Sequence, residues 1–191
     1  MTTQREELKD LIESEGIIRA HNPKYPFHLA SGRETNYYVD MRKIILDWRV
    51  IDIIPALLSE LVPEDVVYVG GVPTAGLLLI GPVIREAQRD RPPGAETIFG
   101  GFYVRNQMKQ HGSGNEIEGV WKPGAVACLL EDTVTTAGSL LTAAAKARKK
   151  GLLIKYALCV FDREEGGREA LAAEGIELFS IFKASEFDGL K

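Results

Sequence analysis

The sequence has few of the residues that build disulfide frameworks or metal centres. Its 191 residues include two cysteines and three histidines. Cys128 and Cys159 each lie in an apolar run, which favours buried free thiols and a reducing, cytoplasmic environment. The sequence has no CxxC pair, and His21, His28 and His111 are scattered, which argues against a zinc site.

Long apolar runs and an excess of positive charge are also missing. No stretch reaches the roughly 18 apolar residues that a membrane-spanning helix needs, so no membrane partner is expected. The formal net charge is -4, which disfavours non-specific binding to nucleic acid or to an anionic membrane surface. Neither GxGxxG nor GxxxxGK[ST] occurs, and this counts against a standard dinucleotide-binding fold and a P-loop.

The sequence does contain an ordinary share of hydrophobic residues, 45%, in alternating patterns. The expected strands are 66–69, 97–104, 125–130, 153–161 and 178–182. The expected helices between them are 75–88, which Pro82 should interrupt, 140–150 and 164–174. This alternation predicts an α/β fold with a mostly parallel sheet flanked by helices.

The N-terminal part predicts a smaller set of elements. A helix should end near Gly16, and strands at 27–30 and 37–40 should be joined by a turn at 31–32. A further helix at 48–61 contains Pro55, which is expected to kink it or to mark a break.

One polar segment, 105–118, fits no helix or strand. Structureless loops of this length are typical of lids and binding loops. Arg105, Lys109 and His111 place three potential cations on it. The alternative interpretation is a solvated loop with no ligand.

The clearest chemical signal is CLLEDTVTTAGSL at 128–140. A buried strand ends in Glu131 and Asp132, and a loop of small and hydroxyl residues leads into a helix. Ligands of open parallel sheets bind beyond the carboxyl ends of strands, and the start of a helix favours an anion. The acids suit ribose hydroxyls, or Mg²⁺ held mainly by substrate phosphates. The alternative is a polar turn capped by a Thr or Ser side chain.

Arg163 follows an apolar strand and should therefore lie at the same edge of the sheet as the two acids. A guanidinium there can hold a carboxylate bidentately, or it forms a salt bridge with a neighbouring acid. Tyr37 and Tyr38 offer a ring face to a flat base, or one of them belongs to the core.

Segment 128–140 closely resembles the signature with which type I phosphoribosyltransferases bind 5-phosphoribosyl-1-diphosphate. Three other stretches are similar to motifs of orotate phosphoribosyltransferases. These are HLASGRETNYYVDMRK at 28–43, similar to their N-terminal hood, FYVRNQMKQHGSGNEIEG at 102–119, similar to their catalytic loop, and VFDREEGG at 160–167, similar to their orotate-recognising strand end. Their order and spacing match too, over nearly the whole chain.

The resemblance implies a single domain, 1–191, with a hood at about 1–45 and a flexible lid at 105–118. It implies transfer of a phosphoribosyl group from 5-phosphoribosyl-1-diphosphate to orotate, which gives orotidine 5'-phosphate and diphosphate on the route to UMP. The implied cofactor is Mg²⁺, with no direct protein ligand set. The implied assembly is a homodimer in which the lid serves the neighbouring subunit's site.

The resemblance also assigns roles to individual residues. The catalytic residues would be Lys109, at the diphosphate leaving group, and Asp132, at the ribose. The donor-binding residues would be Arg105, Lys109, His111, Glu131, Asp132, Thr133, Val134, Thr135, Thr136, Ala137, Gly138 and Ser139. The orotate-binding residues would be Thr135, Arg163 and Tyr38.

Three positions depart from the family pattern, because Ala30, Gly70 and Asn106 stand where many members carry Lys. Some members also lack the first two lysines. Asn106 leaves the lid one cation short, and loss of a charged clamp costs on the order of 2–4 kcal/mol of transition-state stabilisation. Two alternatives therefore stay open: a phosphoribosyltransferase for another base, or a catalytically weak regulator of the same fold that senses the donor.

Overall fold

The computed structural model describes residues 3–21, 27–28, 34–89, 100–105 and 115–190. Its main sheet contains β5 (Tyr68–Gly71), β6 (Gly100–Val104), β7 (Ile117–Gly119), β8 (Val126–Val134), β9 (Leu153–Asp162) and β10 (Glu177–Lys183). The strand order is β10-β9-β8-β5-β6-β7. Only the β6–β7 pair is antiparallel in this sheet. The predicted α/β fold with a mostly parallel sheet is confirmed.

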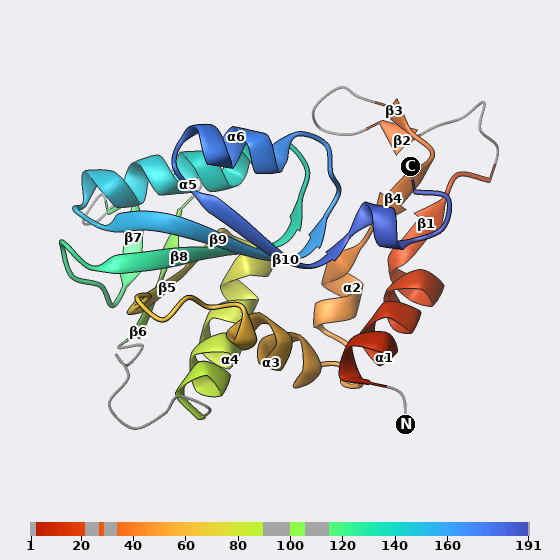
Figure 1. The fold of residues 1–191 in the computed structure, drawn as a ribbon, viewed down its shortest axis with the longest axis horizontal. Helices are drawn as coiled ribbons and strands as arrows, with labels where there is room; N and C mark the ends of the chain where they lie inside the picture. The colour runs from red at the N-terminus through yellow and green to blue at the C-terminus, as the bar shows by residue number, and fades with distance from the viewer. Residues whose placement is uncertain (1–2, 22–26, 29–33, 90–99, 106–114, 191) are drawn as a thin grey trace.

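Helices cover both faces of this sheet. Figure 1 shows α5 (Gly138–Lys149) and α6 (Gly167–Ala173) on one side, and α3 (Ile53–Glu60) and α4 (Ala75–Arg89) on the other. The central strand β8 serves both layers, since its successive side chains point to opposite faces. Cys128 and Leu130 belong to the buried cluster that includes α3 and α4. Ala127 and Leu129 belong to the cluster that includes α5.

The N-terminal elements lie beside the sheet, at the right of Figure 1. They are α1 (Gln4–Leu11), a π-helical turn η1 (Ile12–Gly16), β1 (Ile17–Arg19), β2 (Phe27–His28), β3 (Glu34–Thr35), β4 (Tyr37–Val39) and α2 (Met41–Ile45). The helix ends at Gly16, as predicted. The predicted pairing of the strands at 27–30 and 37–40 is wrong, because β2 pairs with β3 and β4 pairs with β1. Residues 31–32 lie outside the described residues.

Several predicted boundaries also change. The helix predicted at 48–61 begins only at Ile53, close to the break that Pro55 was expected to mark. Pro55 lies in its first turn, where a missing N–H costs little. α4 continues through Pro82. The last helix begins at Gly167 rather than at 164. The chain closes with β10 and a short 3-10 turn, η2 (Ala184–Glu186).

The start of α4 rests directly on β8. A Cβ atom added to Gly76 would lie 2.2 Å from the carbonyl oxygen of Leu130, and one added to Gly71 would lie 2.6 Å from the carbonyl oxygen of Gly76. No side chain fits at either position without moving backbone. Two glycines therefore bring the first turn of α4 against the end of the central strands.

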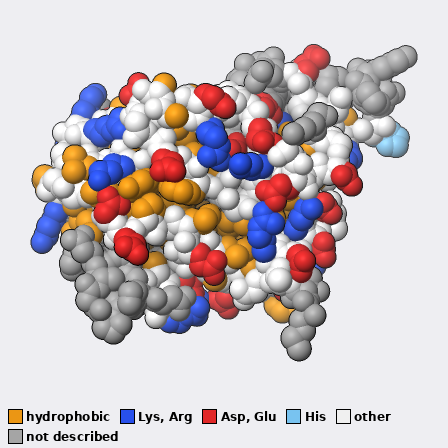
Figure 2. All heavy atoms as spheres, in the orientation of Figure 1, with side chains coloured by type: hydrophobic (Ala, Val, Ile, Leu, Met, Phe, Trp, Pro, Cys, Tyr) orange, Lys and Arg blue, Asp and Glu red, His pale blue; other side chains and the backbone are white. Residues whose placement is uncertain are grey.

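The described helices include none with the length and apolar character needed to cross a membrane. On the face shown in Figure 2, Lys and Arg side chains are interspersed with Asp and Glu side chains.

Candidate active site

A cavity of about 480 Å³ opens at the carboxyl end of β8. Its walls come from 38–42 at the end of β4 and the start of α2, from 74–75 where α4 begins, from 131–140 and from Arg163 after β9. The structure thus brings together most of the residues predicted from the sequence. These are Tyr38, Glu131, Asp132, Thr133, Val134, Thr135, Thr136, Ala137, Gly138, Ser139 and Arg163.

The two acids lie in the last part of β8, which runs past the predicted end at 130 to Val134. Glu131 is 8% exposed and its Oε2 accepts a hydrogen bond from Ser139 Oγ at 3.0 Å. Burial, followed by the charge of Asp132, raises the pKa of Glu131 to about 8. Burial also raises the pKa of Asp132, while the Thr133 N–H and the Arg42 guanidinium oppose that shift. The pair is therefore desolvated and well placed to accept ligand hydroxyls.

The shifted pKa of Glu131 predicts how stability changes with pH. Between its ordinary pKa of 4.5 and about 8, the folded state holds a proton that the unfolded chain has lost. Stability must therefore fall as pH rises through this window. From pH 6 to pH 8, the wild-type protein should lose about 2 kcal/mol more unfolding free energy than Glu131→Gln.

Urea denaturation of both proteins at the two pH values measures this difference. Glu60→Gln, at an exposed position on the last turn of α3, is the control and should follow the wild type. Parallel losses in Glu131→Gln and the wild type would contradict the shifted pKa.

The loop between β8 and α5, predicted to bind a phosphate, lines this cavity. Ala137 precedes α5 in a left-handed conformation, with φ 61, and provides no side-chain cap. The alternative of a turn capped by a Thr or Ser side chain is therefore wrong. Gly167 supports the loop from behind, since a Cβ there would lie 2.6 Å from the Thr135 carbonyl oxygen. The first N–H groups of α5 lack an intrahelical partner and suit an anion.

Arg163 is held at the end of β9 by contacts with several elements. Its Nη2 lies 2.8 Å from Glu165 Oε1 and 3.4 Å from Thr35 Oγ1, and its guanidinium carbon lies 4.6 Å from the centre of the Tyr37 ring. The salt-bridge interpretation is thus right in part. However, Arg163 Nε is buried and has no acceptor among the described residues. A buried donor without a partner is costly, and a ligand carboxylate in the cavity would satisfy it.

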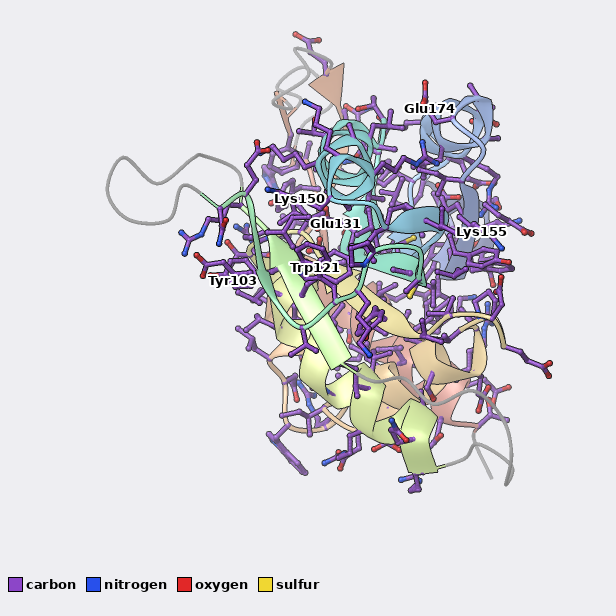
Figure 3. The ribbon with its side chains drawn as sticks, turned by 90° about the vertical axis from the view of Figure 1, so that its left-hand side faces the viewer. Tyr103, Trp121, Glu131, Lys150, Lys155 and Glu174 are labelled. Carbon is purple, nitrogen blue, oxygen red and sulfur yellow. The ribbon has the colours of Figure 1, made fainter. Side chains whose placement is uncertain are left out.

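In the described part of segment 105–118, Arg105 makes contacts within its own chain and not with the predicted donor site. Its guanidinium pairs with Glu118 at 2.8 Å and donates to the Tyr103 hydroxyl at 3.1 Å. Arg105 does not line the cavity, and Figure 3 labels its neighbour Tyr103 and Glu131, which belong to different strands, β6 and β8. Residues 117–119 form β7, which the sequence reading missed.

Several predicted positions cannot be placed. Lys109 and His111 lie outside the described residues, as do Ala30 and Asn106.

The sequence reading missed the wall formed by Asp40, Arg42 and Thr74. Arg42 Nη2 donates to the Tyr38 hydroxyl at 3.1 Å, and its Nε pairs with Asp40 at 3.2 Å. The sequence signal that could have identified Arg42 was its position as a cation inside the hood-like motif at 28–43. For Thr74, the signal was a Gly-Gly-Val-Pro-Thr turn directly after a strand.

Packing accounts for the glycine at position 70. A Cβ atom there would lie 2.5 Å from the ring of Phe102 and 2.7 Å from Leu129 Cδ2. The space that a lysine stem would need is filled by the core beneath α5. Gly70 and Phe102 therefore form a matched pair in this chain.

Comparison with known proteins shows the family to which the chain belongs. No family model matches the chain. A curated protein from Aquifex aeolicus, named orotate phosphoribosyltransferase, is 36% identical over 184 residues, which is 96% of this chain and 97% of its own length. The chain belongs to the orotate phosphoribosyltransferase family.

Solved structures of that family superpose on the whole fold. The Mycobacterium tuberculosis orotate phosphoribosyltransferase in complex with Fe(III) dicitrate has a TM-score of 0.75 at 30% identity, over 96% of this chain and 98% of that one. A structure of the same enzyme in complex with 5-phospho-alpha-D-ribosyl 1-diphosphate has a TM-score of 0.73 at 29% identity, with the same two coverages. The orotate phosphoribosyltransferase fold is thus present from the hood to the last strand.

Proposed function

We propose that this chain transfers the phosphoribosyl group of 5-phosphoribosyl-1-diphosphate to orotate, forming orotidine 5'-phosphate and diphosphate in UMP synthesis. The bond between ribose C1 and the diphosphate oxygen breaks, and its electron pair leaves with the diphosphate. Orotate N1 bonds to C1 with the electron pair that it shared with its proton, and that proton passes to solvent or to the departing diphosphate. Membership of the orotate phosphoribosyltransferase family supports this proposal, and so does the pairing of two acids with a buried arginine in one cavity.

Each wall of the cavity has one task in the proposed reaction. Asp132 and Glu131 accept hydrogen bonds from the ribose hydroxyls and thereby hold ribose C1 in position. Residues 135–139 and the start of α5 bind the 5'-phosphate. Arg163 binds the carboxylate of orotate through its unpaired Nε, and Tyr38 with Thr135 positions the base. Since the base is held against C1, much of the rate enhancement comes from orientation.

Mg²⁺ fits this site as a partner of the substrate. Among the described residues, no three His, Cys, Asp or Glu side chains gather as a metal site, and the cavity offers the adjacent carboxyls of Glu131 and Asp132. A cation with few protein ligands keeps waters and binds substrate phosphates. When bound, it neutralises charge on the departing diphosphate.

The proposed assembly is a homodimer acting in the cytoplasm, with Lys109, Arg105 and His111 of one subunit's lid serving its partner's site. Free Cys128 and Cys159 fit a reducing compartment. An apolar surface supports the dimer, because large hydrophobic side chains are exposed before α3 and along α4. They are Leu46, Trp48, Ile51, Leu77 and Leu78.

The observation that carries the proposal is that buried Arg163, whose Nε has no acceptor among the described residues, lines the same cavity as the two acids. The test is release of diphosphate from the donor with and without orotate and Mg²⁺. We expect release only when orotate and Mg²⁺ are both present. Release with a neutral purine but not with orotate would assign another base, and binding of donor without release by any base would indicate a regulator.

A further inference from the structure

Two arginines line the cavity among the described residues, and the proposed reaction so far uses one of them. Arg163 has a side chain that is 4% exposed and paired with Glu165. The Arg42 side chain is 59% exposed. Tyr38 and Asp40 each engage one of its nitrogens. A guanidinium has five N–H donors, so Arg42 is oriented by the hood while donors are left for a ligand.

Arg42 and the loop before α5 lie on opposite faces of the main sheet. Leu140 and Ala144 of α5 belong to one buried cluster. Met41 and Ile44, which flank Arg42 on α2, belong to the other, together with Leu79 of α4. The two acids at the end of β8 line the same cavity as Arg42 and the loop before α5.

The shape of the donor matches this arrangement. 5-Phosphoribosyl-1-diphosphate carries one phosphate at C5 and two at C1, on either side of a ribose. With the 5'-phosphate at the start of α5 and the hydroxyls at the acids, the diphosphate points toward the wall that contains Arg42 and Thr74.

We infer that Arg42 binds the diphosphate group of the donor and stabilises the charge that this group gains as it leaves. The inference rests on the proposed function and adds a residue to it. A planar guanidinium suits adjacent phosphate oxygens better than a single amine does.

Calorimetric titration of Arg42→Ala with diphosphate and, separately, with ribose 5-phosphate tests the inference, each in the presence of Mg²⁺. We expect the Kd for diphosphate to rise at least tenfold and that for ribose 5-phosphate to change less than twofold. Arg42→Lys should recover part of the diphosphate affinity. Arg49→Ala is the matched control, because Arg49 is an exposed arginine paired with Glu15 and lies outside this cavity. It should bind both probes as the wild type does.

Two results would overturn the inference: unchanged diphosphate affinity in Arg42→Ala, or an equal or larger loss of ribose 5-phosphate affinity. The second would place Arg42 at the 5'-phosphate instead. An equal melting temperature of Arg42→Ala and wild type excludes misfolding as the cause. Neither titration involves orotate, so a failure of orotate-dependent release in the wild type rejects the proposed acceptor and leaves this measurement valid.

Discussion

Replacing Arg163 with leucine should raise the KM for orotate by about 100-fold and change the KM for 5-phosphoribosyl-1-diphosphate less than threefold. A truncated partner of a buried charge pair typically costs about 2–5 kcal/mol. In the proposed binding mode, the donor contacts the other walls of the cavity and would keep those contacts. Steady-state kinetics with each substrate varied in turn measures both constants.

Measuring activity with a panel of bases tests the proposed role of Arg163 more specifically. Arg163→Leu should lose most of the preference for orotate over uracil, which lacks the carboxylate. Arg163→Lys should fall between wild type and leucine, because an amine keeps the charge without the bidentate geometry. Arg85→Leu, at an exposed arginine on α4, is the control. Equal losses for donor and orotate would contradict the carboxylate role.

Replacing Lys109 with alanine is expected to lower turnover by about 100- to 1,000-fold, the cost of removing one donor to a developing oxyanion. Lys109 is proposed to contact the diphosphate as it leaves, so kcat should fall more than donor affinity does. Lys122→Ala, at an exposed lysine, is the control. Unchanged turnover in Lys109→Ala would remove this residue from the chemistry.

Mixed subunits extend this test to the dimer. Lys109→Ala and Asp132→Asn are each expected to be nearly inactive alone. If the lid serves the partner's site, each mixed dimer has one intact site, formed by the acids of one subunit and the lid of the other. Random pairing at equal amounts should then restore about a quarter of the wild-type activity. No recovery in a verified mixed dimer would place each lid over its own site.

The sheet and the centre of the site were predictable from local signals. Apolar runs bounded by Gly or polar residues identified β8, β9 and β10. Glu131 and Asp132 led the sequence reading to end β8 early, since charged residues suggest the edge of a buried strand. In the structure the strand continues, because Glu131 and Thr133 still pair with β9 and open onto the cavity.

The hood was less predictable because its strands are short and their partners are distant in sequence. β4 pairs with β1, about twenty residues earlier, and a turn signal at 31–32 carries no information about that choice. Arg42 was missed for a similar reason. Its place in the site depends on α2 packing against β8, which no periodicity within 28–43 encodes.

Gly76 has no side chain, and this absence sets the spacing between two walls of the substrate cavity. It sets how near the wall with Thr74 and Arg42 comes to the wall that begins α5, because the first turn of α4 touches the Leu130 carbonyl directly. A methyl group at this position would push the two walls apart. The absence of a Cβ atom at position 76 would therefore contribute to selectivity for a sugar that carries phosphates at both ends.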